Sequence, residues 1–121
     1  MKKILVLGAG AMGSAFTVPC LDNKNDVILI GTHLENKIID QIVNGENMHP
    51  SLTCKLPKEL KIKKFQEFKN EFKEKPDLIV LGVNSKSKKL FSCAFATSPH
   101  VPKNRILLFG SIIILFLMQI L

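Results

Sequence analysis

Cysteine is scarce in this sequence: Cys20, Cys54 and Cys93 are far apart, and none belongs to a C-x-x-C pair. An odd number of widely separated cysteines predicts neither a metal site nor a disulfide framework. Tyr and Trp are absent, so Phe supplies every aromatic ring. The apolar run Ile4–Leu7 is too short for a secretory signal peptide. Together these absences favour a reduced, cytoplasmic setting.

The first part of the chain lacks a net positive charge, and the excess of basic residues lies in the rest. The net charge of the 121 residues is +7, made up of −1 over residues 1–54, +4 over residues 55–75 and +4 over residues 76–121. A basic stripe can attract nucleic acid or an anionic membrane. A Lys-rich helix is more often a solvated surface, however, and we therefore expect no nucleic-acid partner.

Short apolar runs alternate with helical patterns along the chain. Pro19 should shorten or kink the first helix, and Gly45 should end the second. Phe65, Phe68 and Phe72 share a helical spacing that predicts a core-facing stripe. This alternation predicts the α/β class, with a Rossmann-type doubly wound parallel sheet. The expected strands are 3–7, 26–30, 60–64 and 78–83, and the expected helices are 10–21, 35–44 and 66–74.

The chemistry is concentrated in the motif Gly8-Ala9-Gly10-Ala11-Met12-Gly13, a G-x-G-x-x-G that follows a strand and opens a helix. Gly8 permits the tight turn, Gly10 lets a pyrophosphate approach the backbone, and Gly13 lets the helix pack against the strand. The free N–H groups at the helix start would hold the phosphates. The motif therefore predicts a site for NAD or NADP, and the alternative is a tight turn that binds no ligand.

The end of the second strand bears on the choice between NAD and NADP. An acid about 20 residues past the last glycine would bind the ribose 2′-hydroxyl and favour NAD. Thr32 and His33 occupy this point, so a strict preference for NAD is not supported and NADP is allowed. Glu35 is close enough in sequence to leave the choice open. An ordinary exposed loop histidine is the alternative interpretation of His33.

The first part of the chain resembles the N-terminal domain of NAD(P)-dependent glycerol-3-phosphate dehydrogenase. The glycine motif is shared by every Rossmann enzyme, whereas the continuation S-A-F-T-V-P and the segment V-I-L-I-G-T-H-L are much narrower signals. The matching stretches occur in the family's order and spacing, and they are Lys2–Pro19, Asp22–Asp40, His49-Pro50, Lys55–Pro57 and Asp77–Val83.

The resemblance implies a two-domain oxidoreductase that transfers a hydride between a nicotinamide and C2 of glycerol 3-phosphate or dihydroxyacetone phosphate. The family's catalytic lysines lie in a T-K-G segment and in a helical C-terminal domain, and neither is found here, so no catalytic residue is assigned. The cofactor residues implied beside the three glycines are Ala11 and Met12 at the pyrophosphate, Thr32 and His33 at the adenosine ribose, and Val83 and Asn84 near the nicotinamide.

The resemblance ends near Lys86. We expect an NAD(P)-binding domain over 1–90 and a divergent segment over 91–121, with an apolar tail over 106–121 and the helical substrate domain absent. A premature stop or a frame change would explain this. The tail is too short for an ordinary spanning helix, which needs about 20 residues. Three interpretations of residues 106–121 remain: a membrane anchor, a buried strand followed by a helix, or a tail without an evolved role.

The expected function is cofactor binding within an oxidoreductase, and this chain alone is expected to be inactive. A small phosphorylated substrate is expected only in a full-length form, and no metal is expected. One alternative is a nucleotide-binding module without catalysis, possibly tethered to a membrane by its tail. Another is a fragment of a different Rossmann dehydrogenase, such as a ketopantoate reductase.

Overall fold

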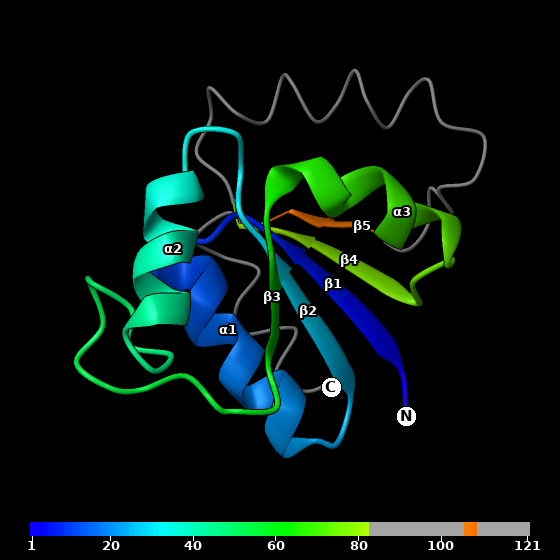
Figure 1. The fold of residues 1–121 in the computed structure, drawn as a ribbon. Coiled ribbons are helices and arrows are strands. Elements are labelled where there is room, and N and C mark those ends of the chain that lie inside the picture. Colours follow the sequence, from blue (N-terminus) through cyan, green and yellow to red (C-terminus); the bar gives the residue numbers. More distant parts are fainter. Residues whose placement is uncertain (83–105, 109–121) are drawn as a thin grey trace.

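A parallel five-stranded sheet with the order β3-β2-β1-β4-β5 forms the centre of the protein (Figure 1). The structure is a computed structural model that describes residues 1–82 and 106–108. β1 lies in the middle and pairs in parallel with both β2 and β4. The expected α/β parallel sheet of the Rossmann type is thus confirmed. The strands are β1 Lys3–Leu7, β2 Asp26–Ile30, β3 Lys61–Lys63, β4 Leu78–Leu81 and β5 Ile106–Leu108.

Helices cover both faces of this sheet. α1 and α2 lie on one face, while the short 3-10 helix η1 and α3 lie on the other (Figure 1). Because parallel strands are joined by crossovers that return over the sheet, both faces become buried. The helices are α1 Ala11–Asp22, α2 Asn36–Asn44, η1 Phe65–Glu67 and α3 Phe68–Lys73.

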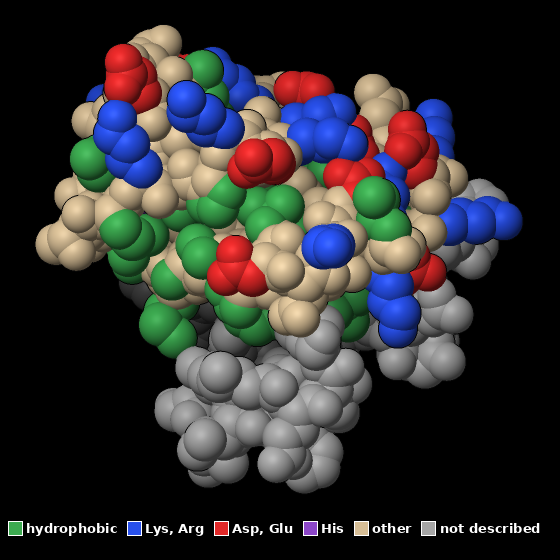
Figure 2. All heavy atoms as spheres, turned by 90° about the horizontal axis from the view of Figure 1, so that it is seen from below, with side chains coloured by type: hydrophobic (Ala, Val, Ile, Leu, Met, Phe, Trp, Pro, Cys, Tyr) green, Lys and Arg blue, Asp and Glu red, His purple; other side chains and the backbone are tan. Residues whose placement is uncertain are grey.

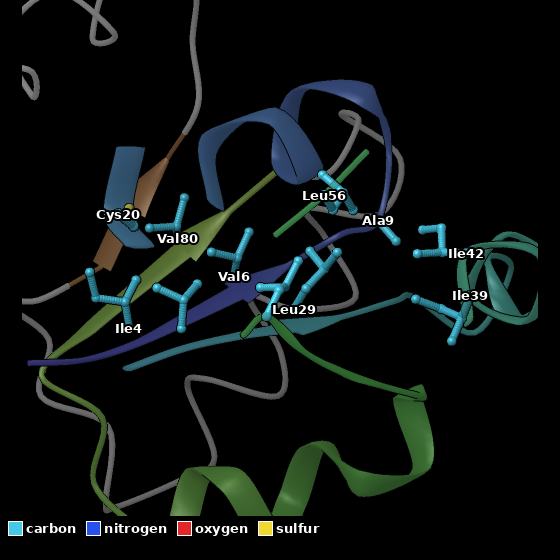
Figure 3. Packing of buried hydrophobic residues seen from close by; sticks show 11 residues of the cluster. Ile4, Val6, Ala9, Cys20, Leu29, Ile39, Ile42, Leu56 and Val80 are labelled. Atoms are coloured by element: carbon cyan, nitrogen blue, oxygen red, sulfur yellow. The ribbon is translucent and has the colours of Figure 1, made fainter. Parts of the chain in front are cut away.

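The side chains of β1 alternate between two hydrophobic cores. Ile4 and Val6 belong to the core beneath α1 and α2 (Figure 3), and Leu5 and Leu7 belong to the core beneath α3. All four are fully buried. A strand that is buried on both faces must be apolar at every position, which explains the continuous run I-L-V-L.

The aromatic stripe packs as the sequence predicted. Phe68 and Phe72 are buried in the second core, and Phe65 packs against it. The rings of Phe68 and Phe72 meet edge to face with centroids 4.3 Å apart, whereas those of Phe65 and Phe68 are stacked at 5.6 Å. Edge-to-face and offset stacked pairs are the favoured geometries for aromatic rings.

Two details of the helices differ from the expectation. α1 continues through Pro19 to Asp22 and is therefore not shortened. Pro19 lies near the end of the helix, so its missing N–H removes one hydrogen bond and the final turn still closes, with Asn23 N–H donating to the carbonyl of Pro19. The third helix begins as the 3-10 turn η1 before α3. Gly45 caps the end of α2, as expected.

Half of the eight lysines of residues 55–75 make ion pairs with acids, namely Lys55, Lys61, Lys63 and Lys64. Figure 2 shows basic and acidic side chains interspersed on one side of the molecule. Mixed charge of this kind fits the solvated surface expected from the sequence, although the absence of a nucleic-acid partner stays a prediction. Pairs with 2.8 Å between nitrogen and oxygen join Lys55 to Glu46, Lys61 to Asp26 and Lys64 to Asp40.

Several expectations concern residues outside the described ranges. Val83, Asn84 and the tail beyond Leu108 are among them, so the proposed nicotinamide contacts and the domain limits of 1–90 and 91–121 stay predictions. The start of the apolar tail forms β5, which pairs with β4. Within residues 1–82 and 106–108, no helix is long and apolar enough to cross a membrane.

Candidate functional site

The glycine motif lies where the order of the strands reverses. β1 is followed along the chain by α1 and β2 on one side, while β4 pairs with its other side. In open parallel sheets, ligands bind outside the carboxyl ends of the strands at such a reversal. The glycine loop, residues 8–10, begins directly after the last residue of β1 and leads into the first turn of α1. The fold therefore places the motif at the expected position for a ligand.

Gly8 makes the turn out of the strand with a φ of 108°. L-residues rarely adopt this conformation, because a Cβ would clash with the neighbouring backbone. The Gly8 N–H donates to the carbonyl of Ile30 at the end of β2, with 2.8 Å between nitrogen and oxygen. This bond fixes the start of the loop against the neighbouring strand.

Gly13 and Gly82 allow three segments of backbone to come together. A Cβ built on Gly13 would lie 2.2 Å from the carbonyl oxygen of Gly8, and one built on Gly82 would lie 2.9 Å from the Cα of Gly13. The Gly82 N–H also donates to the carbonyl of Leu7 at 2.8 Å. The sequence motif did not indicate Gly82, because this residue follows β4 and comes close to Gly13 only through the long-range pairing of the sheet.

Gly10 differs from Gly13 because the described residues leave room for a side chain there. Its φ of −66° and ψ of 173° suit any residue. Among residues 1–82, a Cβ built there would have one neighbour within 4 Å, Oε1 of Glu35 at 4.0 Å. The described residues therefore crowd the backbone less at Gly10 than at Gly13, as the approach of a pyrophosphate would require.

The first turn of α1 supplies hydrogen-bond donors beside this space. The first N–H groups of a helix have no acceptor within it, and they carry the positive end of the helix dipole. Within this part of the described chain, α1 has no side-chain cap and no acidic residue in its first turn. Ala11 is half-buried and Met12 is exposed. An anion would find both donors and a favourable dipole here.

The backbone of Ala9 is held through both its N–H and its carbonyl. Its N–H donates to Oε2 of Glu35 at 2.9 Å. Its carbonyl accepts hydrogen bonds from Nε2 of His49 at 2.8 Å and from Oγ of Ser14 at 3.3 Å. These contacts come from different parts of the chain, and together they fix the orientation of the glycine loop before any ligand arrives.

His49 is fully buried, and its hydrogen bonds define its tautomer. The Ser51 N–H donates to Nδ1 at 3.0 Å, so Nδ1 must be the acceptor. Nε2 then carries the proton that is donated to Ala9. Sequence reasoning used His49 in the family resemblance but assigned it no place at the site. The only sequence signal for a role of His49 was that His49-Pro50 is one of the loop stretches that match the family.

Thr32 and His33 lie in different surroundings. Thr32 is buried, and its N–H donates to Oε2 of Glu35 at 2.8 Å. His33 is exposed, and its ring meets Phe65 edge to face with centroids 5.9 Å apart. The structure thus joins Thr32 to the glycine loop through Glu35 and places His33 against η1. The contact of either residue with a ribose stays a prediction.

The shifted pKa values among the described residues belong to the core and to ion pairs. Burial raises the pKa of the Cys20 thiol to about 11. Burial also raises the pKa of the Glu71 carboxyl, but hydrogen bonds from Lys63 and Lys3 outweigh it, so the net pKa is lowered. The described residues contain no group of three or more His, Cys, Asp or Glu side chains that could hold a metal ion.

Comparison with known proteins adds a specific relationship to this geometry. A stretch of 53 residues is 47% identical to the NADP(+)-dependent glycerol-3-phosphate dehydrogenase of Archaeoglobus fulgidus. The resemblance seen in the sequence is confirmed. The match covers 44% of this chain and 16% of the archaeal enzyme, so the chain spans a small part of that relative's length. No model of a protein family matches the chain.

Proposed function

We propose that this chain binds NADP or NAD, with the pyrophosphate at the glycine loop and the adenosine ribose near Thr32. The open space in front of Gly10, at the positive end of α1, is the observation that carries the proposal. The named cofactor of the archaeal relative supports it. Three features support the proposal: the room at Gly10, the N–H groups of the first turn of α1 and the place of the glycine loop at the strand-order reversal.

The reaction that we propose for a longer, complete form is that of a glycerol-3-phosphate dehydrogenase. A bound nicotinamide would supply the hydride exchanged with C2 of dihydroxyacetone phosphate or glycerol 3-phosphate. The described residues contribute binding and orientation of the cofactor in this proposal. Val83 and Asn84 follow β4 in sequence and are proposed to lie toward the nicotinamide, as the family resemblance implies. Support for the substrate comes from the name of the archaeal relative.

Replacing Gly10 with Val tests the proposed cofactor site directly. The backbone conformation at Gly10 is acceptable for Val, and the first atom of the new side chain meets open space. The variant should therefore fold, while its side chain occupies the position proposed for the pyrophosphate. We expect binding of NADH and NADPH, measured by calorimetry, to weaken at least about 100-fold, as loss of the main phosphate contacts requires.

Ala15→Val provides the matched control. Ala15 is an exposed residue of the same helix, so this change adds the same side chain at a distance from the loop. The control should retain the affinity of the wild-type chain for both cofactors. Equal affinity of Gly10→Val and wild type, with both folded, would rule out this binding site.

A further inference from the structure

Glu35 places its carboxylate at the edge of the proposed cofactor site. Oε2 accepts hydrogen bonds from the N–H groups of Ala9 at 2.9 Å and Thr32 at 2.8 Å. Oε1 is the atom found 4.0 Å from the position of a Cβ on Gly10. A negative charge therefore lies between the loop after β1 and the loop after β2, beside the space left open in front of Gly10.

The backbone holds this carboxylate in place. Glu35 is the N-cap of α2. Its N–H donates to the carbonyl of Thr32 at 2.9 Å, and its own carbonyl accepts from the N–H of Ile39 at 3.0 Å. Two backbone donors then fix the side chain itself. Carboxylates that accept from several N–H groups make strong, well-oriented hydrogen bonds, so the charge has a defined position.

The Glu35 carboxylate lies where an acid at the end of β2 would otherwise be expected. An acid about 20 residues beyond the motif binds the ribose hydroxyls in many dinucleotide sites. The chain has Thr32 and His33 there, and Glu35 follows at the start of α2. Because the Glu35 side chain returns to the N–H of Thr32, its carboxylate reaches the end of β2 from outside the strand.

We propose that Glu35 determines how strongly the site discriminates against a 2′-phosphate. The inference rests on the proposed function, because it concerns the ribose end of the same cofactor site. A fixed carboxylate repels a phosphate brought within a few ångströms and has no such effect on a hydroxyl. The affinity of this site for NADP is therefore weakened by Glu35 relative to its affinity for NAD.

Glu35→Gln removes the charge and preserves the hydrogen bonds. The amide oxygen of Gln can accept from Ala9 and Thr32 as the carboxylate does, so the loop geometry should survive. Glu59→Gln removes the same charge from an exposed loop position and is the matched control. Glu35→Ser is a second variant without the charge, in case the longer amide disturbs the fold. Each protein is titrated with NADH and with NADPH by calorimetry.

We expect both Glu35 variants to raise the affinity for NADPH relative to NADH by about tenfold, as removal of a nearby like charge should. Glu59→Gln should leave that ratio within about twofold of wild type, because the interaction of a distant exposed charge is screened. If the Glu35 variants bind both cofactors with the same ratio of affinities as wild type, the inference about Glu35 is wrong and the proposed function still stands. A wild-type chain that binds neither cofactor would overturn the proposed function, and the inference with it.

Discussion

Cys20 shows how burial changes the chemistry of a single residue. It lies in the core between α1 and the sheet (Figure 3), and its pKa is raised to about 11. The thiolate is the reactive form of cysteine. At pH 8 we therefore expect iodoacetamide to modify the exposed Cys54 and to leave Cys20 at least about tenfold less modified, as mapped by mass spectrometry of peptides.

The same reaction in guanidinium chloride is the control for this prediction. Unfolding exposes both thiols and removes the effect of burial on the pKa, so Cys20 and Cys54 should then react at similar rates. Equal labelling of the two residues in the folded chain would show that Cys20 is accessible, contrary to its place in the core.

Sequence reasoning succeeded at residues whose role is local. The glycine motif could be located because its spacing and its strand-to-helix context lie within a few residues. The contacts of Glu35 and His49 could not be predicted in this way, since they reach Ala9 across 26 and 40 residues. Gly82 was missed for the same reason, because its close approach to Gly13 exists only once β4 has paired with β1.

At the scale of elements, the loop after α2 supports the glycine loop through His49. Replacing His49 with Ala removes the donor to the Ala9 carbonyl and the acceptor for Ser51 N–H. We expect the free energy of unfolding to fall by about 2 kcal/mol or more, the usual consequence of losing buried hydrogen bonds and packing. We also expect the Ala9 amide to exchange its hydrogen at least about tenfold faster relative to the central Ile28 amide, measured by NMR.

Leu60→Ala separates this loop effect from general destabilisation. Leu60 is buried in the core that contains Ala9, just before β3. Its truncation should cost about 2 kcal/mol or more without removing any of the hydrogen bonds described above for Ala9. The Ala9 and Ile28 amides should then change together. If His49→Ala also changed both amides equally, the histidine would be an ordinary core residue and not a support for the loop.

The elements themselves were largely predictable, and the differences have local causes. β1 and β2 have the expected bounds, because each is a short apolar run ended by a turn. The start of the third helix was harder to predict, since the Phe spacing of residues 65–72 fits both a 3-10 turn and an α-helix. In α1, the position of Pro19 near the end made its effect smaller than the residue type suggested.

For the whole molecule, we propose that binding and turnover are separable. Reduction of a ketone by a bound cofactor also requires the substrate held in line with it, and a group that stabilises the developing alkoxide. We therefore expect a polypeptide of these 121 residues to bind NADPH without oxidising it in the presence of dihydroxyacetone phosphate. The measurement is the decrease in NADPH absorbance over time, with a purified polypeptide that contains no dehydrogenase from the expression host.

Lys86, Lys88 and Lys89 provide the decisive comparison, because they follow β4 in sequence and are the nearest basic groups there. They lie outside the described residues. Turnover above about 1 per second, within the ordinary enzyme range, that is lost when these lysines are changed to Ala would show that the chain carries its own catalytic group. Turnover that the triple variant retains would point to other groups and would equally contradict the proposed separation.

The central place of β1 also affects how the protein is made. Ile4 pairs with Val27 on one side and with Leu78 on the other. At ordinary translation rates, β4 leaves the ribosome about 4 to 15 seconds after β1. During that interval one edge of β1, within the fully apolar run Ile4–Leu7, has unpaired backbone groups. Such an edge is a template for pairing with other chains. The same strand that anchors the finished sheet is therefore open to pairing with other chains until β4 has been made.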